Sequence, residues 1–256
     1  MNVTMQRWIG TGVLGLAMSL PAVGSLTNYT QDFENLDRTS PTALSDDGWQ
    51  LFAAGINGSG SYFNFGAGPF PAPNNISSPN ISVISDVPSG GDPPAGNQGL
   101  VFFSDYESGL HSDPNDPRDL VLSLFQQRII AAEDIGLTVT FSWLAEGNAN
   151  PPTGQAITEA FLLTLDPNNN FSATNNLSSI TTSVLDGAPT PGSLVLALTD
   201  PALVGQILQF GFRNTASDFE GSAVDYDNIS FAVPEPASAM LLAVGGLVAV
   251  ARRRKV

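Results

Sequence analysis

This chain consists largely of short apolar runs separated by clusters of Gly, Pro, Asn and Asp. The spacing of these runs constrains the fold more than any other feature. In "LTVTFSW" (137–143) apolar residues alternate with Thr and Ser, which is typical of a strand with one buried face. Roughly ten such strands, with no convincing amphipathic helix away from the ends, predict an all-β fold: an antiparallel β-sandwich. The other runs are "DGWQLFAA", "GSYFNFG", "ISVIS", "GLVFFSD", "DLVLSLFQQ", "AFLLTLD", "SLVLALT", "ILQFGF" and "AVDYDNISF".

Two stretches are irregular and predict long loops. Residues 66–99 are dense in Pro, Gly and Asn, broken only by "ISVISDV", and residues 105–119 are acidic and interrupted by proline. Long loops on a sandwich are where binding sites usually lie, although a decorated surface without function is an equal alternative.

The end of the chain has three elements in order: "VPEP", an apolar run over Ala237–Ala251 and a cluster of cations. As a helix the run is roughly 22 Å long, short of the roughly 30 Å hydrocarbon core, and arginine stems extend the span. The cations would keep this end in the cytoplasm. An ordinary short anchor is the alternative to a sorting tag. The residues of the predicted motif are Val233, Pro234, Glu235, Pro236, Arg252, Arg253, Arg254 and Lys255.

This tail resembles that of the PEP-CTERM family of exported bacterial proteins. The resemblance implies that an exosortase, a membrane transpeptidase, recognises the tail and cuts it near the PEP motif. It also implies a Gram-negative envelope and an association with exopolysaccharide or biofilm matrix. The partners expected are therefore the exosortase and export machinery, exopolysaccharide, and the inner membrane transiently through the C-terminal helix.

The N-terminus predicts a signal peptide. Arg7 gives a positive start, Trp8–Leu20 is an apolar run, and Ala22 and Gly24 are the small residues of a cleavage site before Ser25. A retained N-terminal anchor is the alternative. The predicted organisation is a signal peptide at 1–24, one β-sandwich domain at 25–232 and the sorting tail at 233–256. The precursor would be tethered to the inner membrane, and the processed protein would lie on the cell surface or in the extracellular matrix.

Charge and composition exclude several functions. The net charge is −15, and all 24 acids lie between Asp32 and Glu235, whereas five of the nine cations belong to the two terminal signals. A body this acidic repels nucleic acid and anionic lipid, so neither is an expected partner. The chain has no cysteine, so disulfides cannot support the fold after export.

The residue inventory leaves little room for catalysis. His111 is the only histidine, the only lysine is in the tail, and no phosphate-binding glycine pattern is present. We expect no catalytic residues, no enzyme activity and no required cofactor. A secreted polysaccharide-active hydrolase is the alternative, because glycoside hydrolysis needs only two suitably spaced carboxylates.

Aromatic side chains beside the irregular segments are candidates for stacking on sugar rings. We expect Trp49 and Tyr106 to bind a ligand in this way, with core packing as the alternative for both. Trp143 continues the apolar face of its strand and is expected in the core.

The body resembles the galactose-binding-like jelly roll of many carbohydrate-binding modules, in the order "QDFE", "LFQQRI", "GQILQFGF" and "VDYDNISF". This implies that the opening and closing strands come close and that acids on them hold a structural Ca²⁺. Carried over, the ligands are Glu34 and Asp227, with Asp32 and Asp225 as weaker matches. The alternative is that these acids are solvated charges that discourage edge pairing. The body is thus expected to be a carbohydrate-interacting or matrix-structural module.

Overall fold

A computed structural model of the chain describes residues 25–57, 62–76, 81–86, 98–104, 118–147, 157–181, 189–216 and 222–234. The predicted signal peptide and the apolar run before the terminal cations lie outside these residues. Within them, the helical elements are α1 (Ala43–Asp46) and two 3-10 turns, η1 (Ala132–Asp134) and η2 (Pro201–Leu203). None of these is long and apolar enough to span a membrane.

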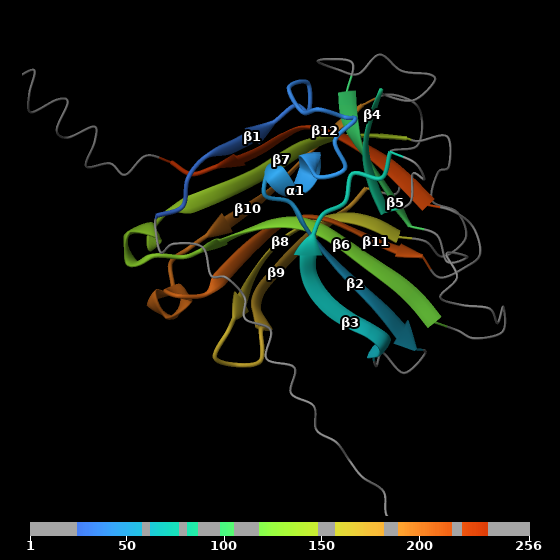
Figure 1. Cartoon of the computed structure of the whole chain (residues 1–256). Helices are drawn as coiled ribbons and strands as arrows, with labels where there is room; N and C mark the ends of the chain where they lie inside the picture. The colour runs from blue at the N-terminus through green and yellow to red at the C-terminus, as the bar shows by residue number, and fades with distance from the viewer. Residues whose placement is uncertain are drawn as a thin grey trace, which may run out of the picture.

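Twelve β-strands make up most of the described chain (Figure 1). They are β1 (Tyr29–Gln31), β2 (Gln50–Asn57), β3 (Tyr62–Pro71), β4 (Ile81–Asp86), β5 (Gln98–Ser104), β6 (Arg118–Ile129), β7 (Thr138–Gly147), β8 (Ile157–Asp166), β9 (Ser172–Ile180), β10 (Thr190–Ala197), β11 (Ile207–Ala216) and β12 (Ser222–Ala232).

The strands form two antiparallel sheets. The first sheet has the order β10-β7-β12-β5-β4, and the second has the order β3-β2-β6-β11-β8-β9. The short strand β1 pairs with the second half of β12, Ile229–Phe231. The first half of β12 pairs with β5 along the same side of the strand. The chain passes repeatedly from one sheet to the other, so the fold is the predicted antiparallel sandwich of jelly-roll type.

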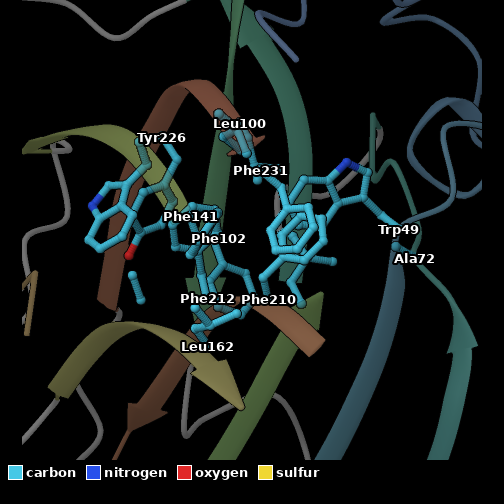
Figure 2. Packing of buried hydrophobic residues seen from close by; sticks show 14 of the residues in the cluster. Trp49, Ala72, Leu100, Phe102, Phe141, Leu162, Phe210, Phe212, Tyr226 and Phe231 are labelled. Carbon is cyan, nitrogen blue, oxygen red and sulfur yellow. The ribbon is translucent and has the colours of Figure 1, made fainter. Parts of the chain in front are cut away.

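The core lies between the two sheets and is rich in aromatic rings (Figure 2). Phe210 of β11 stacks on Phe231 of β12 with ring centroids 4.5 Å apart, and Phe212 stacks on Tyr226. In β7 the residues Phe141 and Trp143 are buried and Ser142 between them is half-exposed, which confirms the predicted alternation. Because the stacked rings come from β11 of the second sheet and β12 of the first, this cluster holds the two sheets together.

Three parts of the chain differ from the sequence prediction. Gly66–Pro71 belongs to β3 rather than to a long loop. β9 was not predicted, because its sequence, "SATNNLSSI", is polar; it is the edge strand of the second sheet and buries little. The opening strand ends at Gln31, so Asp32 and Glu34 do not lie two apart on a strand; the chain turns there, and Phe33 has a φ of 59°.

Candidate functional site

Trp49 is a core residue, and the expectation that it stacks on a ligand is wrong. Its side chain is 1% exposed, and its ring is stacked on Phe212 with centroids 6.4 Å apart. The indole Nε1 donates to the Tyr29 hydroxyl at 3.0 Å and to Asp47 Oδ2 at 3.2 Å. Figure 2 shows Trp49 at one end of the aromatic cluster and Tyr226 at the other. Tyr106, the other predicted stacking residue, lies outside the described residues.

The predicted calcium ligands gather where the chain leaves β1 beside β12. Asp32 Oδ1 accepts a hydrogen bond from Glu34 N at 3.2 Å, and Glu34 Oε1 accepts one from the backbone of Gln98 at 2.7 Å. Asp227 is 6% exposed, and its Oδ1 accepts from Asn228 N at 2.6 Å where a bulge interrupts β12. Each of these carboxylates therefore keeps one oxygen outside these hydrogen bonds.

Electrostatics show that three of these acids act on one another. The pKa of Asp227 is raised to about 6, mainly by burial and also by the charges of Glu34 and Asp32, although the bond from Asn228 N lowers it. Within the described residues, no three His, Cys, Asp or Glu side chains are close enough together to hold a metal. Any ion bound here would need backbone carbonyls or water to complete its shell.

The fourth predicted ligand, Asp225, is not among the charges that shift the pKa of Asp227, and it faces a different acid. It is directly opposite Glu146 of β7 in the sheet register, and both side chains are more than nine-tenths buried. Burial also raises the pKa of Glu146. Sequence analysis did not single out Glu146, although the alternation of β7 places it on the same face as Ser142, away from the core.

The outer face of the second sheet carries a set of half-exposed polar side chains over aromatic rings. Gln209 of β11 donates through Nε2 to Gln127 Oε1 of β6 at 3.2 Å, directly across the two strands. Four residues further along β11, Arg213 Nη1 lies 2.6 Å from Glu159 Oε1 of β8. We call these four residues, Gln127, Gln209, Arg213 and Glu159, the outer polar row.

A glycine lies between two aromatic residues in the middle of this row. Gly211 lies between Phe125 and Phe161 in the register, and a Cβ on it would be 2.1 Å from Leu124 O and 2.6 Å from Phe125 Cα. The two rings are 6.5 Å apart, and the Arg213 guanidinium lies over Phe161 at 5.0 Å. Amides, a guanidinium and a carboxylate over apolar rings are the mixture by which proteins bind polar ligands with a planar face.

The sorting tail begins where the fold ends. β12 ends at Ala232, and the backbone N–H of Val233 donates to Asn28 Oδ1 at 2.6 Å, so the first residue of the VPEP motif is held against the N-terminal segment. Pro234 is the last described residue of this region; Glu235, Pro236 and the four terminal cations lie outside the described residues.

Comparison with protein families identifies the tail. Residues 232–255 match the PEP-CTERM protein-sorting motif, so the chain carries an exosortase-type export-sorting signal. No curated protein sequence matches the chain.

Several solved β-sandwich structures are similar to this one. A structure of carbohydrate-binding modules from the β-sandwich superfamily is 15% identical, with a TM-score of 0.40; the match covers 79% of this chain and 62% of that chain, less than two thirds of it. The CBM22-1 xylan-binding domain of Xyn10C from Paenibacillus barcinonensis is 9% identical, with a TM-score of 0.40, and covers 84% and 100%. A cyclase from Fischerella sp. TAU is 10% identical, with a TM-score of 0.41, and covers 81% and 98%.

Proposed function

We propose that this protein is exported, cut at both ends, and displayed in the extracellular matrix, where its sandwich binds a polysaccharide through the outer polar row. The signal peptide would be removed before Ser25, and an exosortase would cut near Val233–Pro236. The partners are the export machinery, the exosortase and a matrix exopolysaccharide, with the inner membrane as a transient tether in a Gram-negative envelope.

The observation that carries the binding proposal is the outer polar row itself. Gln127 and Gln209 form one hydrogen-bonded amide pair, Arg213 with Glu159 forms a second polar pair, and the Phe125 and Phe161 rings lie between the two pairs along the sheet, with the Arg213 guanidinium over Phe161. Sugars offer hydroxyl groups to such donors and acceptors, and apolar ring faces to the surface between them.

Affinity electrophoresis in gels that contain the producer's own polysaccharide tests this proposal. We expect Gln127→Ala and Gln209→Ala each to weaken retardation about 5- to 10-fold, because each removes hydrogen bonds worth about 1 kcal/mol. Ser142→Ala, on the outer face of the first sheet, is the control and should bind normally. If no variant changes binding, or the wild type is not retarded, a purely structural role in the matrix is favoured instead.

We also propose that a Ca²⁺ ion binds beside β1 and β12 as a structural ion, held by Glu34 and Asp227, with backbone carbonyls or water completing its shell and Asp32 adding only nearby negative charge. The mutual proximity of these acids supports this, since a divalent cation would offset the repulsion that raises the Asp227 pKa. An ion that binds only the folded state raises the unfolding midpoint as its concentration passes its Kd. Millimolar calcium should raise the midpoint, and Glu34→Gln or Asp227→Asn should remove that shift, whereas Glu133→Gln on the exposed η1 turn should not.

A hydrolase acting on polysaccharide is a second candidate, and one observation favours it. Asp225 and Glu146 are buried acids that face each other across β12 and β7. Directly opposed antiparallel residues have Cβ atoms about 4.5–5.5 Å apart, so the two carboxylates are near neighbours on one face of the sheet, and glycoside hydrolysis needs such a pair. Release of reducing ends that is lost in Glu146→Gln, with binding preserved, would support this function over simple binding.

A further inference from the structure

Asp134 is a fully buried carboxylate that holds the start of the described chain. It closes the η1 turn between β6 and β7 and is 0% exposed. Oδ1 accepts hydrogen bonds from Ser25 Oγ at 2.7 Å and from Leu26 N at 3.0 Å. Oδ2 accepts from Ala131 N at 2.8 Å. This side chain therefore anchors the N-terminal segment to the body before the chain enters β1.

These three bonds leave the negative charge without a cation. Among the described residues, no Lys, Arg or His side chain lies at ion-pair distance from Asp134. Burying a carboxylate without a counter-charge is costly even when its oxygens are hydrogen-bonded. A positive charge that reached this carboxylate would therefore stabilise the fold.

One group is placed to supply that charge. The backbone nitrogen of Ser25 is three covalent bonds from the hydroxyl oxygen that contacts Asp134, so it lies within roughly 6 Å of the carboxylate. In the precursor this nitrogen is an uncharged amide. When the chain begins at Ser25 it is an α-ammonium, with an ordinary pKa of about 7.7–8.0.

We propose that removal of the signal peptide creates an ion pair between the new α-ammonium of Ser25 and the buried carboxylate of Asp134, and that this pair locks the N-terminal segment onto the body. The proposal rests on the cleavage before Ser25 that forms part of the proposed function. It assigns Asp134 as an internal docking site for the mature N-terminus, and it makes cleavage a step that stabilises the fold.

The locked segment also contacts the other end of the chain. Leu26 is in the main core, β1 pairs with β12, and Asn28 accepts from Val233 at the start of the sorting tail. A precursor that still carries its signal peptide keeps these contacts but lacks the ion pair. The mature form should therefore hold the base of its tail more firmly than the precursor does.

Selective blocking of the α-amine tests the pair, because the sequence has a single lysine, Lys255, in the tail. The exported protein would be acetylated, the modified sites identified by mass spectrometry, and its thermal midpoint compared with that of the untreated protein. Acetylation should lower the midpoint by about 3–10 °C in the wild type and leave that of Asp134→Asn unchanged. An equal shift in both proteins, or none in the wild type, would overturn the proposal.

A second variant keeps the test valid if Asp134→Asn does not fold. One alanine inserted between Gly24 and Ser25 moves the α-ammonium one residue away and leaves the carboxylate intact. We expect this mature protein to melt at the midpoint of the acetylated wild type; a midpoint equal to that of the untreated wild type contradicts the pair. The N-terminus of each sample is read by mass spectrometry. A native start other than Ser25 refutes the proposed cleavage, whereas a correct start without the stability difference refutes only the ion pair.

Discussion

The residue Asp227 shows how a buried acid links the candidate calcium site to pH. Its pKa in the folded protein is about 6, against about 3.9 in an unfolded chain. Between these values the folded state binds more protons than the unfolded state, so stability is full below about pH 4 and falls as pH rises through 6.

Asp227→Asn should remove this loss. In chelator, we expect the wild type to lose about 1–2 kcal/mol of unfolding free energy between pH 4.5 and pH 7.5 relative to the variant, after allowance for solvent screening. Denaturant titrations at the two pH values measure the difference. Parallel behaviour of the two proteins would mean that the carboxyl is solvated and ionises normally.

Gly211 is the residue on which the outer polar row depends for its apolar base. A methyl group here would meet the backbone of β6, which cannot move aside as a side chain can. Gly211→Ala should destabilise the protein by about 1–3 kcal/mol, as overpacking does, and weaken polysaccharide binding with it. Thr215→Ala, on the same strand and face, is the matched control in urea unfolding; equal stability of the two variants would contradict this packing.

Single residues also show where sequence reasoning fails. Trp143 was predicted correctly as core because it lies within a strand in which apolar and polar residues alternate, and it falls on the apolar face. Trp49 precedes its strand, and its burial depends on Tyr29 and Phe212, which are distant in the sequence. The pattern of neighbouring residues shows which face of a strand a residue is on. Contacts with residues distant in the sequence cannot be seen in that pattern.

At the scale of elements, strands with an apolar face were predictable, including the edge strands β3, β4 and β10, whereas the polar edge strand β9 was not. β9 buries mainly Leu177 against the core and presents polar residues elsewhere, so it carries no hydrophobic period. The outer polar row was missed for a related reason. Its four residues come from β6, β8 and β11, and only the register brings them together.

The edge strand β10 gives a prediction about how elements pack. Gly192 lies opposite Trp143 of β7, and a Cβ there would be 2.4 Å from the indole ring. Gly192→Ala should therefore displace the Trp143 ring, shift the tryptophan fluorescence and lower stability by about 1–2 kcal/mol. Ser193→Ala, exposed on the same strand, should change neither; unchanged fluorescence in the glycine variant would show that the ring has free space.

At the scale of the whole molecule, the C-terminal sorting motif and the fold class were the parts most readily predicted from sequence. The PEP-CTERM motif is contiguous, and a family match finds it over residues 232–255. The all-β class follows from spacing, because many short apolar runs separated by turn residues are typical of a sandwich or a barrel. A binding surface has no such contiguous signal.

Processing at both ends is the prediction for the whole chain. Intact mass spectrometry of the protein outside the cell should fit a chain that starts at Ser25 and ends within Val233–Pro236. Deletion of the exosortase gene should retain the C-terminal tail and leave the N-terminus unchanged, because the two cuts use different enzymes. Extracellular protein that still contains Arg252–Lys255 would refute the sorting role.

The hydrogen bond from Val233 to Asn28 has a topological consequence. The two ends of the mature chain leave the sandwich side by side, with β1 and β12 paired beneath them. A linker of a few residues would join them into a ring without bending either strand, and the ring could be reopened elsewhere on the surface. The sandwich is thus suited to circular permutation: the fold should form even when the chain begins and ends at other points on the surface.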